Sequence, residues 1–307
     1  MSANNQNNAV QSNVSEIPPS PTKVGAFDPN VSVTNKLLPL AAFFIAFVTV
    51  MTILIVYMDH TAMKHYQFQV NMSQDNEFYG VAQDNPQLIT YIREVHLTPA
   101  IEPHHKMLES EDTISNDTIY VLKLLNNKRN GVFVEAGAYG DGKTSKTDWL
   151  ERKLNWRGLL IQSDPRHYFS LRRHNRVRSQ AIHACLSPIP YPKEVTLHQE
   201  HDGVKINSIH ANSIEDTDSF NTRVKCFPIY SLLLAMNVMD IDYLSLEAGG
   251  TELQVLETIP FDKVNIKIIS VTLTANDLEK ETIKKFLAKM NYTFMQSFNT
   301  TYIFKMN

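Results

Sequence analysis

The sequence predicts an α/β fold with a mostly parallel sheet, placed behind a single membrane-spanning helix. A long apolar segment near the N-terminus predicts the span, and a later alternation of short apolar runs with helix-like stretches predicts the sheet. Near-continuous apolar strands separated by helices are typical of a parallel sheet covered on both faces. The chain ends in two alternating segments, residues 292–298 and 300–306, which predict a C-terminal antiparallel hairpin.

The apolar segment, residues 37–58, contains no charged residue. As a helix it would extend about 33 Å, enough to cross the core of a bilayer. A polar tail precedes it, so we expect an uncleaved signal anchor rather than a cleaved signal peptide. Lys23 and Lys36 lie before the span and Lys64 lies after it, a slight bias toward a cytosolic N-terminus. We therefore expect a type II membrane protein with residues 59–307 in the lumen.

Composition divides the chain into four parts. Residues 1–36 are rich in Asn, Ser and Pro and are expected to be a disordered cytosolic tail before the transmembrane signal anchor, residues 37–58. Residues 59–114 are weakly patterned and are expected to be a stem, and residues 115–307 are expected to be the luminal domain. Its expected strands are 131–136, 157–163, 181–187, 241–247 and 266–274. Its expected helices are 145–154, 165–175, 229–236, 251–258 and 277–290.

Glycosylation sequons lie on both sides of the span, so they do not fix its orientation. A luminal placement makes four asparagines acceptors for N-linked glycans. These are Asn71, Asn116, Asn291 and Asn299.

Charge and cysteine content exclude several classes of function. The net charge of −3 disfavours a nucleic-acid partner. The two cysteines, Cys185 and Cys226, form no zinc-binding pattern, so no metal site is expected. In a lumen they favour a disulfide, which would close a loop of about 40 residues and contribute about 4 kcal/mol in the chain-entropy model. Two buried free thiols are the alternative.

The first strand end has the layout of a cofactor site. Ligands of open parallel sheets bind beyond the carboxyl ends of the strands. There, the strand 131–136 runs into a glycine-rich turn. Gly137 would let the chain pass close to a cofactor, and Glu135 would anchor the cofactor's polar end. The same glycines would also fit a tight turn that needs positive φ angles, and both interpretations stay open.

The second strand end lacks the acidic residue that commonly holds a ribose. Gln162 stands there instead, and such an amide loses about 1.5–2 kcal/mol of charge-assisted hydrogen bonding. That loss corresponds to roughly tenfold to thirtyfold weaker binding. Asp164 follows, directly before Pro165, so Asp164 either contacts the cofactor or caps the next helix.

The third strand end carries Glu247, followed by the turn 249–250. Glu252 and Glu257 are expected on the solvent face of the following helix. No candidate general base stands beside Glu247 in the sequence, so no catalytic residue is predicted. Three histidines are expected to be surface or strand residues rather than catalysts: His167, His174 and His183.

Several motifs carry a resemblance to a known family. The stretches FVEAGAYGDGKTSKTDWLERKLNWRGLLIQSDPRHY, ACLSP, NSI, CFPIYSLLLAMNV, IDYLSLEAGGTELQVLETIPF and IKIISVTLT resemble the FkbM-type methyltransferase domain over about residues 80–305. Within that superfamily they are most similar to the Star family of insect membrane proteins. The resemblance implies a Rossmann-like S-adenosylmethionine-methyltransferase fold. It places Glu135, Gly137, Asp164 and Glu247 on the cofactor side.

The Star family implies a further role. Its members are similar to methyltransferases but act as type II membrane proteins of the secretory pathway. They assist export of membrane-anchored, epidermal-growth-factor-like precursors from the endoplasmic reticulum, which serves EGF receptor signalling. For this chain the resemblance implies endoplasmic reticulum and Golgi membranes, with endosomes as a further compartment.

All three strand ends depart from the enzyme pattern of the resembled family. Gly140-Asp141 replaces Asp-Gly, Gln162 begins Gln-Ser-Asp-Pro in place of Glu-Pro-Asp-Pro, and Glu247-Ala-Gly-Gly replaces Asp-Val-Glu-Gly. Changes at three ends of one crevice favour a retained fold with a decayed pocket. We therefore expect no cofactor, and S-adenosylmethionine only if the pocket still functions.

Two enzyme hypotheses stay open. One is an active S-adenosylmethionine-dependent O-methyltransferase of the endoplasmic reticulum or Golgi lumen, which would use Glu135 and Asp164. The other is a luminal glycosyltransferase, in which Asp216-Thr217-Asp218 would hold a metal and a sugar nucleotide.

Overall fold

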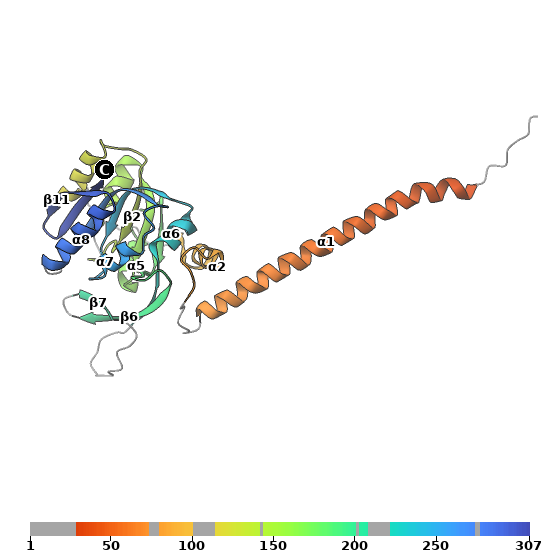
Figure 1. Cartoon of the computed structure of the whole chain (residues 1–307), viewed down its shortest axis with the longest axis horizontal. Helices are drawn as coiled ribbons and strands as arrows, with labels where there is room; N and C mark the ends of the chain where they lie inside the picture. The colour runs from red at the N-terminus through yellow and green to blue at the C-terminus, as the bar shows by residue number, and fades with distance from the viewer. Residues whose placement is uncertain are drawn as a thin grey trace, which may run out of the picture. The chain divides into compact units, whose positions relative to one another are not determined.

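The computed structural model describes residues 29–73, 80–100, 114–141, 144–200, 203–207, 222–273 and 277–307. The chain divides into two compact units, residues 1–61 and residues 62–307 (Figure 1).

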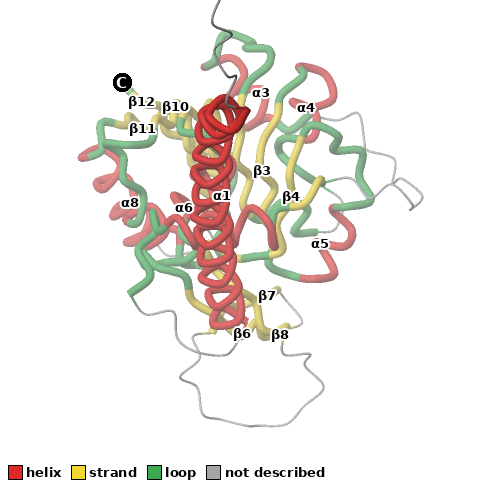
Figure 2. Tube along the Cα trace, turned by 90° about the vertical axis from the view of Figure 1, so that its right-hand side faces the viewer, coloured by secondary structure: helices red, strands yellow, loops and turns green. Residues whose placement is uncertain are grey.

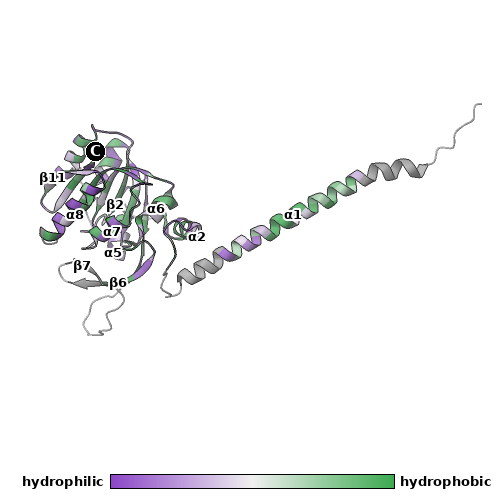
Figure 3. Ribbon diagram, in the orientation of Figure 1, coloured by the Kyte–Doolittle hydropathy of each residue, from purple (hydrophilic) through white to green (hydrophobic). Residues whose placement is uncertain are grey.

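Helix α1 (Pro29–Ser73) contains the apolar segment. Its part from Pro39 to Lys64 has a mean hydropathy of 2.6 and buries none of its side chains in protein, so it is long and apolar enough to cross a membrane. Figure 3 shows this apolar stretch of α1 in green. The helix is longer than predicted. Residues 29–36 and 59–73, expected to be tail and stem, are helical, because each residue added to an existing helix gains a hydrogen bond.

An eight-stranded sheet forms the centre of the second unit. Its order is β1 (Thr98–Pro99), β4 (Ser179–His183), β3 (Arg157–Gln162), β2 (Val132–Ala136), β9 (Asp240–Leu246), β10 (Asn265–Thr272), β12 (Thr301–Met306) and β11 (Tyr292–Phe298). The strands from β4 to β10 are parallel, whereas β12 pairs antiparallel with both β10 and β11. If the short β1 is left out and the other strands of this sheet are numbered by their position along the chain, their order across the sheet is 3-2-1-4-5-7-6. This is the Rossmann-like methyltransferase order, and it confirms the predicted fold class.

Helices cover both faces of this sheet (Figure 2). The helices are α3 (Asn116–Leu124), α4 (Asp148–Leu154), α5 (Pro165–Leu171), α6 (Ile229–Met236), α7 (Glu252–Glu257) and α8 (Asp277–Lys289). Successive strand residues point to opposite faces, so Val134 joins the core with α6, α7 and α8, and Phe133 joins the core with α3, α4 and α5. The predicted two-faced burial is confirmed.

The folded domain begins before residue 115, which corrects the predicted stem boundary. Helix α2 (Pro86–Tyr91) and the single π-helical turn η1 (Ile92–His96) bury Leu88, Tyr91 and Ile92 in the main core. Asn85 caps α2 by accepting hydrogen bonds from two backbone N–H groups. The region looked weakly patterned because a helix this short shows too little periodicity.

A second, four-stranded sheet was not predicted. Its order is β5 (Cys185–Leu186), β8 (Thr222–Phe227), β6 (Lys193–Glu200) and β7 (Gly203–Asn207). A disulfide joins Cys185 to Cys226, which face each other in the β5–β8 register, and this is the pairing expected from the sequence. Figures 1 and 2 place β6 and β7 beyond the ends of the strands of the main sheet, on the side away from the C-terminus.

Candidate functional site

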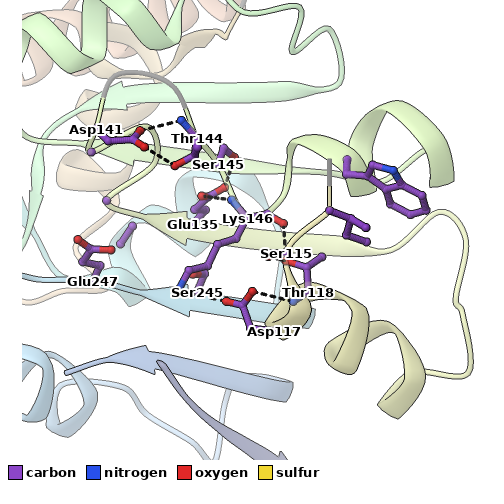
Figure 4. Close-up of a pocket in the computed structure, with 15 residues that line it drawn as sticks. Ser115, Asp117, Thr118, Glu135, Asp141, Thr144, Ser145, Lys146, Ser245 and Glu247 are labelled. Atoms are coloured by element: carbon purple, nitrogen blue, oxygen red, sulfur yellow. Dashed lines mark hydrogen bonds and ion pairs between the residues drawn. The ribbon is translucent and has the colours of Figure 1, made fainter. Parts of the chain in front are cut away.

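A cavity of about 490 Å³ lies at the carboxyl ends of β2 and β9. Its lining includes three of the four predicted cofactor-side residues, namely Glu135, Gly137 and Glu247, whereas Asp164 lies outside it (Figure 4). It also includes Asp141 of the first turn and residues that were not expected there from the sequence: Ser115, Asp117, Thr118, Thr144, Ser145, Lys146, Trp149 and Ser245. Among the lining residues that the structure describes, Lys146 has the only cationic side chain.

Glu135 is held by the chain that follows it. Its side chain is 3% exposed. One carboxylate oxygen accepts a hydrogen bond from the backbone N–H of Lys146 at 2.9 Å. The other accepts from the Ser145 hydroxyl at 2.7 Å and from the Thr147 hydroxyl. Both oxygens of Glu135 therefore position the segment 145–147, which leads into α4.

A glycine is required at position 137 by the backbone φ angle and by the close approach of Glu247. Its φ angle is +83°, in the left-handed region that favours glycine. A Cβ atom at this position would lie 2.9 Å from the Cβ of Glu247. The first turn therefore passes directly against the end of β9. The structure shows the tight turn of one interpretation, and Gly137 also lines the cavity, as the other interpretation requires.

Gln162 and Asp164 are both engaged with their own chain. The Gln162 amide donates to the carbonyl of Ala138 at 2.7 Å and accepts from the Asp164 backbone N–H at 2.9 Å. Asp164 caps α5 by accepting from the backbone N–H groups of Arg166 and His167. Burial opposes ionisation of Asp164, but hydrogen bonds from the Arg166 side chain and backbone outweigh it and lower its pKa. Of the two interpretations of Asp164, the structure shows the helix cap.

The ammonium group of Lys146 joins three elements across the cavity floor. It donates to the hydroxyls of Thr272 at 2.9 Å and Thr301 at 3.1 Å, and it forms an ion pair with Asp117 at 3.6 Å. Lys146 therefore links α3 to the ends of β10 and β12. Figure 4 shows its side chain between Glu135 and Asp117.

Glu247 is exposed at the cavity. Partial desolvation raises the pKa of its carboxyl group, the Lys146 ammonium opposes this shift, and the carboxylates of Glu135 and Glu252 add to it. Within the described part of the lining, four carboxylates accompany the Lys146 ammonium group: Asp117, Glu135, Asp141 and Glu247.

A buried arginine fixes the wall behind the cavity. Arg176 is fully buried and pairs with Glu151 at 2.7 Å. It also donates to the hydroxyls of Tyr139 at 3.1 Å, Ser145 at 2.9 Å and Thr147 at 2.7 Å. Burial disfavours its charge, but Tyr139, Glu151 and Glu135 raise the pKa of Arg176 and keep it ionised. Sequence reasoning missed this residue because its partners lie 25 to 37 positions away.

Two expectations about side chains near the site are corrected. Glu252, expected on a solvent face, is 3% exposed, and its carboxylate accepts from the backbone N–H groups of Ala248 at 2.8 Å and Gly250 at 3.1 Å. Those N–H groups belong to the glycine turn and need an acceptor. His174, expected at the surface or on a strand, is buried and stacks on Tyr139 with ring centroids 4.0 Å apart.

The other expectations of this kind agree with the structure. Glu257 is exposed, His167 is partly exposed, and His183 lies in β4. Within the described residues, no three His, Cys, Asp or Glu side chains are grouped to hold a metal ion. The triplet Asp216-Thr217-Asp218 lies outside the described residues, and so does Gly142 of the first turn.

Three comparisons with known proteins were made. No protein-family model and no curated protein matches the chain. Among solved structures, the METTL16 methyltransferase domain is similar with 13% identity, 72% of this chain and 77% of that chain covered, and a TM-score of 0.37. A precorrin-6y C5,15-methyltransferase from Geobacter metallireducens is similar with 10% identity and a TM-score of 0.35. The match covers 64% of this chain and 91% of that chain. A methyltransferase from Pyrococcus furiosus is similar with 15% identity and a TM-score of 0.33. The match covers 67% of this chain and 88% of that chain. No residue role is carried over from these structures.

S-adenosylmethionine is the cofactor that this class of fold implies, and the residues at the ends of β2 and β3 do not fit it. A ribose needs an accessible acceptor at the end of β3, but the Gln162 side chain is 4% exposed and both of its polar atoms are already bonded within the protein. Both oxygens of Glu135 and the carboxylate of Asp164 are likewise bonded to their own chain.

Proposed function

We propose that this chain is a single-pass membrane protein whose methyltransferase-like domain is non-catalytic and binds membrane-anchored protein cargo in the secretory pathway. One observation carries the proposal. At the first two strand ends, the polar groups that would hold a methyl donor are engaged in bonds that shape the domain itself. The class of protein is therefore a methyltransferase-like scaffold behind an apolar anchor.

Holding a methyl donor at the end of β3 would require the replacement of existing hydrogen bonds. Turning Gln162 toward a ribose would release the carbonyl of Ala138 and the N–H of Asp164. A buried polar group left without a partner costs about 1–3 kcal/mol. Releasing both would cost a donor complex about 2–6 kcal/mol, or roughly thirtyfold or more in affinity. This penalty adds to the loss from having an amide in place of a carboxylate.

The cargo follows from the family resemblance. Similarity to the Star family supports epidermal-growth-factor-like precursors as cargo, carried from the endoplasmic reticulum toward the Golgi as part of EGF receptor signalling. The exposed apolar side chains of α1 support membrane anchoring. The disulfide between Cys185 and Cys226 supports an oxidising lumen around the domain.

Co-purification with a chosen cargo tests this proposal. The full chain would be co-expressed with a tagged membrane-anchored precursor of the epidermal-growth-factor class and recovered in mild detergent. We expect the precursor to bring down the full chain but not a variant truncated after residue 79. A matched control replaces residues 39–64 by an unrelated span of equal length and should still associate. The proposal is wrong if no precursor of this class associates with the full chain.

An active methyltransferase remains the second candidate because the cavity is still open. Its volume of about 490 Å³ and the exposed carboxylate of Glu247 support this candidate. Direct binding of the methyl donor separates the two candidates, since a scaffold needs none.

A further inference from the structure

Strand β11 is the outer edge of the main sheet. Within the described residues it pairs with β12 on one side, and nothing continues the sheet beyond it (Figure 1). An unpaired strand presents free N–H and C=O groups on which another strand can pair. The opposite edge strand, β1, contains only two residues and therefore presents few unpaired backbone N–H and C=O groups.

The sequence of β11 lacks two of the usual protections of an edge strand. Its seven residues, YTFMQSF, include no charge and no proline, which are the residues that most often block edge-to-edge pairing. Phe294 is 39% exposed on this strand. A register irregularity between Phe294 and Gln296 interrupts the pairing with β12 and leaves regular strand on both sides of it. A strand of this composition is therefore prone to self-association.

A glycosylation sequon stands at each end of β11. Asn291 directly precedes the strand, and Asn299 lies in the turn between β11 and β12. Both side chains are exposed, and both backbones have positive φ angles, +67° and +49°, which are typical of turns. The side-chain Nδ2 of Asn307 donates to the side-chain Oδ1 of Asn291 at 3.2 Å, so this contact does not use the nitrogen to which a glycan attaches.

We propose that N-linked glycans on Asn291 and Asn299 shield the edge of β11 from pairing with a second copy of this chain. The strand extends about 20 Å, and an N-linked glycan is a bulky, hydrated group at the protein surface. One glycan at each end therefore obstructs the approach of another strand along its whole length. The glycans take the place of the charged residues that β11 lacks. This inference rests on the luminal placement in the proposed function.

Occupancy of the sites is measured first. The full chain would be expressed in cells that glycosylate, extracted in detergent, and analysed by peptide mass mapping with and without removal of glycans. We expect glycans on Asn291 and Asn299. Glycans on Asn116 but on neither of these two would overturn the inference and leave the luminal placement intact. No glycan at any of the four sequons that follow the apolar span, at Asn71, Asn116, Asn291 and Asn299, would overturn both.

Oligomeric state is measured second. Thr293→Val with Asn299→Gly removes both sequons, because valine keeps a β-branched residue in the strand and glycine accepts the positive φ. We expect the fraction of chain above the monomer in size-exclusion chromatography to rise at least fivefold. Asn116→Gln, which removes a sequon at the start of α3, is the matched control and should leave this fraction unchanged.

A third variant separates edge pairing from misfolding. Adding Gln296→Lys to the double variant places a charge within β11 and should return the chain to the monomer, since a lysine on an edge strand opposes pairing. Association that persists with this lysine would show that the edge is not its cause and would overturn the inference. So would a double variant that stays as monomeric as the control although both sites carry glycans in the parent chain.

Discussion

At the residue scale, the cavity is shaped by side chains that bind their own chain. Glu135 holds the segment 145–147, Gln162 bridges two loops, and Asp164 caps α5. The sequence analysis placed Glu135, Gly137 and Glu247 at strand ends, and the structure brings them together because parallel strands end at one edge. Lys146 and Arg176 could not be found in this way, because their partners come from distant elements.

Gly137 gives a prediction about stability. Gly137→Ala combines a positive φ angle with a Cβ contact of 2.9 Å to Glu247, so it should lower the free energy of unfolding by about 2–4 kcal/mol. Gly250→Ala is the matched control, because it has a φ angle of +93° and open space around its Cβ, and it should cost about 1 kcal/mol. Denaturant unfolding of both variants measures the difference. Equal costs would show that the close approach to β9 is not a constraint.

Asp242 gives a prediction about pH. Burial opposes its ionisation, but hydrogen bonds from Lys128 at 2.6 Å and Lys267 at 2.7 Å lower its pKa. A lowered pKa contributes stability above the unfolded value of about 4, and this contribution is lost as the pH falls through the folded value. Asp242→Asn should therefore cost about 1–3 kcal/mol at pH 7 and much less near pH 2.

Unfolding free energies of the parent chain and of Asp242→Asn, measured from pH 7 to pH 2, would show that the difference between them becomes smaller as the pH falls. The exposed Asp262→Asn variant serves as the control and should follow the parent chain throughout. A cost of Asp242→Asn that is the same at both ends of the range would contradict the assignment of this ion pair.

At the scale of elements, periodicity and position predicted most of the main sheet. The apolar runs at 131–136 and 157–163 became β2 and β3, and α6 begins and ends where predicted. The second sheet was missed because β6 (Lys193–Glu200) and β7 (Gly203–Asn207) are polar strands with few apolar residues. Their place depends on the disulfide and on a small cluster that includes Val195, Leu197 and Val224.

The disulfide gives a prediction at this scale. Replacing Cys185 and Cys226 together by alanine removes a bridge across a separation of 41 residues, and should lower the free energy of unfolding by about 4 kcal/mol in the chain-entropy model. Chemical unfolding of the oxidised parent and of the double variant measures this. A difference below about 1 kcal/mol would show that the second sheet does not depend on the bridge.

At the scale of the whole molecule, the fold class was predictable and the start of the folded domain was not. Alternation of strands and helices, followed by a terminal hairpin, leads to the observed strand order. The predicted start of the domain at residue 115 was wrong because α2 and η1 are too short for a periodic signal, although they bury Leu88 and Ile92 completely. The long apolar helix was predicted by length and charge, since α1 carries its apolar residues without a polar face.

Binding of S-adenosylmethionine to the full chain in detergent is the most direct test of the central claim. Isothermal titration would use a donor concentration up to about millimolar, with cooperative unfolding of the same sample as proof of folding. The account predicts no saturable heat, because Glu135, Gln162 and Asp164 are engaged with their own chain. Micromolar binding that weakens in Glu135→Ala would contradict it and would establish a functioning methyltransferase site.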